Sequence, residues 1–88
     1  MYNCYVYVRH AVVYPDVEIA DGTLISGAAS LDDCLAVCSF SRSCQGFDWN
    51  VVRNECRIHT SLTECTDLRN KPGTNHYRLK ANCQPGDV

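Results

Sequence analysis

The spacing of four central cysteines constrains the fold more than any other feature of this chain. They are Cys34, Cys38, Cys44 and Cys56. The first two stand one helical turn apart, where their side chains project in parallel from one face of a helix, so a bond between them is disfavoured. Cys38 can instead close a short loop to Cys44, and Cys34 can reach Cys56 on a neighbouring strand. The spacing therefore predicts a helix cross-linked to a sheet, although the sequence alone leaves other pairings open.

Length and cysteine content place the chain among small disulfide-rich domains. Seven cysteines in 88 residues are typical of an extracellular domain whose apolar core is too small to stabilise it alone. The first twenty residues contain no uninterrupted apolar stretch like that of a secretory signal, and no apolar run is long enough to cross a membrane. We expect one module, residues 1–88 with a core of about 4–83, that belongs to a larger secreted or cell-surface protein.

The charge of the chain is weakly negative and unevenly distributed. The net charge of −2 argues against nucleic acid as the main partner. Residues 1–48 hold two basic and six acidic side chains, whereas residues 49–88 hold six basic and four acidic ones. We interpret this asymmetry as ordinary surface charge.

The residue pattern predicts one helix among antiparallel strands. Alternating β-branched and aromatic residues predict strands at 4–13, 23–25, 45–50, 55–60 and 74–80. Residues 51–54 are expected to connect a hairpin, and 61–73 to form a loop. A helix is expected at 31–40, because Ser30 is a suitable N-cap and Asp33 gives a weaker acidic form of the capping box. These elements make an α+β domain.

The order of the cysteines and the motifs between them resemble the PAN/apple domain family. The residues that carry the resemblance are the C-x3-C-x5-C run at 34–44, Gly46-Phe47-x-Trp49, Cys56, His76-Tyr77-x-Leu79-x3-Cys83 and the spacing from Cys4 to Cys34. The resemblance covers residues 4–83. It implies a curved antiparallel sheet that holds one helix against its concave side. It also implies nested disulfides, Cys4–Cys83, Cys34–Cys56 and Cys38–Cys44.

One cysteine departs from this six-cysteine plan. Cys65 has no partner in the nested pattern, and an odd cysteine in a secreted domain is either a free thiol or a link to another chain. We expect one of these two states for Cys65, so a disulfide-linked partner is one expectation. The alternative is that Cys65 bonds Cys83 and leaves Cys4 unpaired.

The resemblance implies a non-enzymatic adhesion or recognition module. Protein–protein binding is the first hypothesis, and carbohydrate binding, lectin-like or heparin-binding, is the alternative. The expected partner is therefore an extracellular protein or a cell-surface glycan, with no nucleic acid and no membrane insertion. Cys65 with His59 or His76 has the residue types of a thiol nucleophile and its base, but no catalytic signature surrounds them.

Cofactor and metal binding are not expected either. Cys34 and Cys38 fall within the usual spacing of paired zinc ligands, but no second pair at ligand spacing follows them. The cysteines are therefore interpreted as disulfide partners, and no metal site is predicted.

Six polar residues are predicted to share the sheet face opposite the core. They are Asp48, Arg57, His59, His76, Arg78 and Lys80. Polar and planar groups of this kind beside exposed aromatic rings can bind a sugar, although the same pattern describes an ordinary solvated face. Trp49 shares its face with Phe47 and is expected in the core.

Two further surfaces are weaker candidates. Basic residues in the last third of the chain could bind an anionic glycan; they are Arg69, Lys71, Arg78 and Lys80, together with His76. Tyrosines near the N-terminus could contact a protein; they are Tyr2, Tyr5, Tyr7 and Tyr14. The four basic charges do not form a dense run, and some of the tyrosines must cover the sheet. An ordinary structural or surface role is therefore favoured for both sets.

Overall fold

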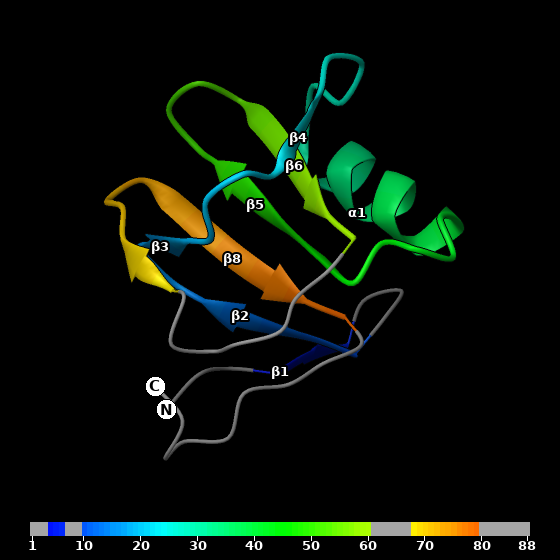
Figure 1. The fold of residues 1–88 in the computed structure, drawn as a ribbon, viewed down its shortest axis with the longest axis horizontal. Helices are drawn as coiled ribbons and strands as arrows, with labels where there is room; N and C mark the ends of the chain where they lie inside the picture. Colours follow the sequence, from blue (N-terminus) through cyan, green and yellow to red (C-terminus); the bar gives the residue numbers. More distant parts are fainter. Residues whose placement is uncertain (1–3, 7–9, 61–67, 80–88) are drawn as a thin grey trace.

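An antiparallel sheet of six strands forms the centre of the computed structural model, which describes residues 4–6, 10–60 and 68–79 (Figure 1). The strand order is β1-β2-β8-β5-β6-β4. Its strands are β1 (Cys4–Val6), β2 (His10–Tyr14), β4 (Thr23–Ile25), β5 (Gly46–Asn50), β6 (Glu55–His59) and β8 (Thr74–Arg78). Two short strands, β3 (Val17–Glu18) and β7 (Arg69–Asn70), pair with each other. The single helix, α1 (Leu31–Phe40), lies beside β5 and β6.

The helix begins where its N-cap residue predicts, and its bounds agree with the predicted 31–40. The Ser30 hydroxyl accepts the N–H of Asp33 at 3.1 Å, and Asp33 Oδ2 accepts the N–H of Ala29 at 3.2 Å. The reciprocal bond of the capping box therefore reaches one residue before the N-cap. The helix has ten residues, and no helix in the described part of the chain is long and apolar enough to span a bilayer.

The core lies between α1 and the inner face of the sheet. Leu35 and the two helical cysteines form the buried stripe of the helix. Phe47, Trp49 and Tyr77 face them from β5 and β8, and the rings of Phe47 and Tyr77 stack with centroids 4.7 Å apart. Burial of such aromatic surface is the main source of stability in a domain of this size. The placement of Trp49 in the core is confirmed, since its side chain is only 5% exposed.

Two of the three predicted disulfides lie within the described residues, and both are confirmed. Cys34–Cys56 joins α1 to β6, and Cys38–Cys44 ties the end of α1 to the segment before β5. Cys83 and Cys65 lie outside the described residues. The Cys4–Cys83 bond and the state of Cys65 therefore stay predictions.

The predicted single strand at 4–13 is wrong. The structure has two antiparallel strands there, β1 and β2, with Cys4 opposite Val12. The sequence between the two strands contains no glycine, proline, asparagine or aspartate, so the residue pattern gives no sign of two strands. The predicted loop at 61–73 contains β7, although residues 61–67 lie outside the described part. A two-residue strand is too short to produce an alternation that a sequence pattern can detect.

Removal of each disulfide should cost a different amount of stability, because the two bonds close loops of different length. The sequence separations are 22 for Cys34–Cys56 and 6 for Cys38–Cys44, which the chain-entropy model converts to about 3 and about 2 kcal/mol. We expect Cys34→Ala/Cys56→Ala to lower the free energy of unfolding more than Cys38→Ala/Cys44→Ala does. Urea denaturation of the two double variants measures this difference, and an equal loss would contradict the prediction.

Candidate functional site

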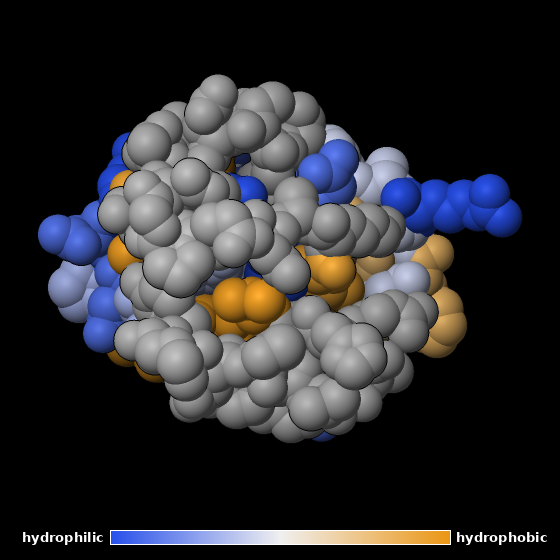
Figure 2. Space-filling view, turned by 90° about the horizontal axis from the view of Figure 1, so that it is seen from below, coloured by the Kyte–Doolittle hydropathy of each residue, from blue (hydrophilic) through white to orange (hydrophobic). Residues whose placement is uncertain are grey.

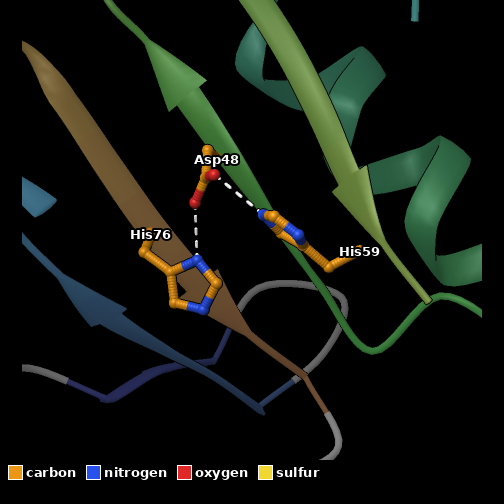
Figure 3. Close-up of side chains that lie close together, drawn as sticks. All are labelled: Asp48, His59 and His76. Carbon is orange, nitrogen blue, oxygen red and sulfur yellow. Dashed lines mark hydrogen bonds and ion pairs between the residues drawn. The ribbon is translucent and has the colours of Figure 1, made fainter. Parts of the chain in front are cut away.

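A buried carboxylate occupies the middle of the outer sheet face, opposite α1. Asp48 Oδ2 lies 2.8 Å from His59 Nε2, and Asp48 Oδ1 lies 2.6 Å from His76 Nδ1 (Figure 3). The backbone N–H of Ile19 also donates to Oδ2, at 3.3 Å. The three residues of this histidine–aspartate cluster (Asp48, His59 and His76) are 3%, 5% and 0% exposed. One carboxylate on β5 is therefore hydrogen-bonded to both neighbouring strands, β6 and β8, and to the segment after β3.

Strand register explains why these side chains converge. Asp48 is directly opposite His76 on β8, whereas His59 and Arg78 both lie opposite Gly46. Gly46 has no side chain, so the face beside Asp48 stays open for the long side chains of its two neighbours. The period-2 alternation of three adjacent strands thus places all four polar side chains on one face.

The hydrogen bonds fix the protonation states of Asp48 and His76. Arg78 Nε donates to His76 Nε2 at 3.1 Å, so His76 donates from Nδ1 to Asp48. Burial lowers the pKa of His76 below its usual 6.5, and the bond to Asp48 offsets this only in part. Burial raises the pKa of Asp48, but the hydrogen bonds from His59 and His76 outweigh it and hold the pKa below 3.8. An ionised carboxylate therefore faces a neutral His76.

The same three residues are types that bind zinc, but their surroundings fit hydrogen bonding better. Two of the separations between their ligand atoms, 2.8 and 2.6 Å, are those of hydrogen bonds, whereas two ligand atoms of one tetrahedral zinc ion lie about 3.3 Å apart or more. Zinc would also need the lone pair of His76 Nδ1, which carries the proton as long as Arg78 donates to Nε2. A cation would in addition lie close to the buried guanidinium of Arg78. The cysteine spacing could not reveal this cluster; the shared strand face was its only sequence signal.

The outer face is covered, which the sequence did not predict. An added Cβ at Gly22 would lie 2.9 Å from the Cβ of Arg57 and 2.9 Å from Cε1 of His59, so this segment packs directly onto β6. On the other side, β3 contacts β8 and pairs with β7. The alternation of polar and apolar residues shows which side chains share a face of the sheet, but it does not show which segment of the chain packs on that face.

This cover changes the predicted set of ligand-binding residues. Asp48, His59, His76 and Arg78 share one face as predicted, but each is at most 5% exposed, so the predicted solvated face is wrong for these four. Arg57 is exposed, as a ligand-binding residue must be. Lys80 lies outside the described residues.

The two weaker surfaces are also corrected. The basic patch does not form as a unit, because His76 and Arg78 are buried, whereas Arg69 and Lys71 are exposed. Tyr14 is 1% exposed, with its ring centroid 6.0 Å from that of His76, so it is not a contact surface. Tyr2, Tyr7 and the side chain of Tyr5 lie outside the described part.

Beside the buried cluster, the outer face opens into a groove of about 690 Å³. Its walls are residues 18–22, the β5–β6 turn and the β7–β8 turn, and its floor includes Asp48, Asn50 and Thr74. In Figure 2, hydrophilic residues (blue) line the left end of the molecule, the end where Figure 1 places β3, β7 and both turns.

The β5–β6 turn is fixed by the residues that flank it. Asn50 Oδ1 accepts the N–H groups of Val52 at 3.0 Å and Arg53 at 2.8 Å. Asn54 has φ = 55°, a left-handed conformation that asparagine tolerates. The hairpin predicted at 51–54 is confirmed, and these two asparagines replace the absent Asn-Gly pair.

The family profile of the PAN domain matches residues 4–83. This span covers the sheet, the helix and the cysteines of the nested plan. The chain belongs to the PAN domain family. No curated protein matches it. PAN domains are commonly protein- or carbohydrate-binding modules and are generally not catalytic, in agreement with the predicted class of function.

Removal of the Asp48 charge should destabilise this PAN domain, since Asp48→Asn sets an amide N–H₂ among buried donors. We expect the free energy of unfolding to fall by about 3 kcal/mol. Asp21→Asn is the matched control, because the same chemical change at an exposed residue should cost under about 0.5 kcal/mol. Chemical denaturation compares the two variants, and similar losses would argue against the role assigned to Asp48.

Acidification should destabilise the domain through His76. Its pKa is below 6.5 in the folded chain, so the unfolded chain binds the proton more readily and stability is lost as pH falls below about 6.5. The contribution to the slope is at most about 1.4 kcal/mol per pH unit. His76→Asn keeps a donor for Asp48 but does not titrate, so its unfolding free energy should vary less between about pH 7 and pH 5. An unchanged slope would contradict this assignment.

Proposed function

We propose that this PAN domain is a non-catalytic recognition module that binds an extracellular protein in the groove on its outer face. The observation that supports this most directly is a groove of about 690 Å³ whose walls are held by hydrogen bonds before any ligand binds. A preorganised site loses less conformational entropy on binding.

The rim of the groove favours a protein over a sugar. Val51 and Val52, at the tip of the β5–β6 turn, are 53% and 78% exposed, and exposed apolar side chains beside charged ones are typical of protein contacts. None of the groove-lining residues in the described part is aromatic, so no ring there can stack on a sugar. Trp49, the strongest stacking residue of the chain, is in the core.

Carbohydrate binding is the alternative, because the groove is rich in hydrogen-bonding groups. Asp21, Asn50, Glu55 and Arg57 all line it and could pair with sugar hydroxyls. Among the members of the predicted set that the structure describes, Arg57 alone is both exposed and placed in this groove.

The cysteines support an extracellular location. Both confirmed disulfides are fully buried, and disulfides of this kind form in oxidising compartments. We infer that the module belongs to a larger secreted or cell-surface protein, and that Cys65 is either a free thiol or a link to a partner chain.

A parallel screen tests the proposed function. The disulfide-bonded domain is applied to an array of secreted and cell-surface ectodomains and to a glycan array. We expect a specific ectodomain to bind, with affinity reduced at least about tenfold by Val52→Asp. Phe40→Ser is the matched control, because Phe40 is 87% exposed at the end of α1 and does not line the groove.

The other outcomes are also decisive. A glycan bound specifically and lost in Arg57→Ala, with no ectodomain bound, would favour the carbohydrate alternative. An ectodomain lost in Phe40→Ser but retained in Val52→Asp would place the binding site outside the groove.

A further inference from the structure

Among the described groove-lining residues that form no ion pair, basic side chains outnumber acidic ones. Four basic and four acidic residues line it. Glu18 is already bonded to Arg69, with Oε2 2.7 Å from Nη2 and 2.9 Å from Nε. Asp48 is already bonded to the two histidines. These two carboxylates therefore have little capacity left for a ligand or for another cation.

Three cations remain in three different segments of the chain. Arg53 is in the β5–β6 turn, Arg57 is on β6 and Lys71 precedes the β7–β8 turn. None of the three has a carboxylate oxygen within 4.0 Å in the described part of the chain. An anionic group in the groove could bind them without first displacing an internal ion pair.

The backbone holds these cations in place before binding. The N–H of Arg53 donates to Asn50 Oδ1 at 2.8 Å. Lys71 donates its N–H to Asp16 O at 2.8 Å and accepts from Thr74 N at 3.0 Å. Arg57 Nη1 reaches Gly22 O at 3.4 Å, so its guanidinium leans toward the groove wall. Three cations on fixed supports favour a ligand with matching charge.

The two remaining carboxylates limit the kind of anion that fits. Asp21 and Glu55 line the same groove, so the excess of positive charge among the unpaired groups is small. A dense polyanion such as a sulfated glycan would meet these carboxylates as well as the cations, and like charges repel. Separate carboxylates on a peptide can avoid them.

Apolar groups beside the cations point to the same ligand. Val51, Val52 and Pro72 are exposed next to Arg53 and Lys71 in the chain. A peptide can present an apolar side chain beside a carboxylate, whereas a sulfated glycan has no such group to bury.

We propose that the groove binds an acidic peptide segment of the partner protein, with carboxylates on Arg53, Arg57 and Lys71 and an apolar side chain against Val51, Val52 and Pro72. This inference rests on the proposed function and names the chemistry of the ligand. Such binding weakens as salt concentration rises, because the cations are solvent-exposed.

A random twelve-residue peptide library displayed on phage provides the probe. Peptides selected on the disulfide-bonded domain should be enriched in Asp and Glu next to Val, Leu or Phe. Their affinity, measured by fluorescence anisotropy, should fall about two- to fivefold in each of Arg53→Gln, Arg57→Gln and Lys71→Gln. Arg42→Gln is the matched control, because it removes an exposed positive charge that does not line the groove.

Each contrary outcome has a separate meaning. Selected peptides that are neutral or basic, and are lost in Val52→Asp but not in the charge variants, would overturn the acidic ligand while leaving groove binding in place. Heparin oligosaccharides that bind while no peptide is selected would overturn it in favour of a sulfated glycan. If neither peptides nor heparin oligosaccharides bind, the acidic-peptide proposal is overturned. In that case, an ectodomain whose binding is lost in Val52→Asp would show that the proposed function still holds.

Discussion

Asp48 places a negative charge under the cover of the outer sheet face, where little solvent reaches it. Its carboxylate accepts from His59, His76 and the backbone of Ile19, so β5, β6, β8 and the segment after β3 all depend on one side chain. Buried charge is costly unless every lone pair is occupied. The same bonds that satisfy Asp48 hold one wall of the groove against the sheet.

The two faces of the sheet are stabilised in different ways. The inner face buries apolar and aromatic side chains against α1, and Cys34–Cys56 links the two covalently. The outer face buries polar groups under the β3–β7 pair and the residues that follow β3. Apolar contacts tolerate small shifts, whereas hydrogen bonds need defined distances and angles. The polar face is thus suited to fix the shape of a binding surface.

Local pattern was enough to predict the helix, the central hairpin and the faces of the central strands. Ser30 indicates the helix start, and alternation along β5, β6 and β8 assigns Trp49 to the core and Asp48 to the opposite face. The cover on the outer face could not be predicted, because β3 and β7 have two residues each and pair across about fifty positions of sequence. The groove depends on the same pairing, so the alternation of residues along the strands does not predict it either.

The contact between residue 22 and His59 makes these two positions sterically interdependent. Any side chain at 22 would meet the imidazole and the Cβ of Arg57 below van der Waals distance. A larger residue at 22 would therefore force this segment away from β6, because a smaller residue at 59 would still leave the Cβ of residue 57 in the way. The absence of a side chain at residue 22 is thus what lets this segment pack directly over the imidazole that donates to Asp48.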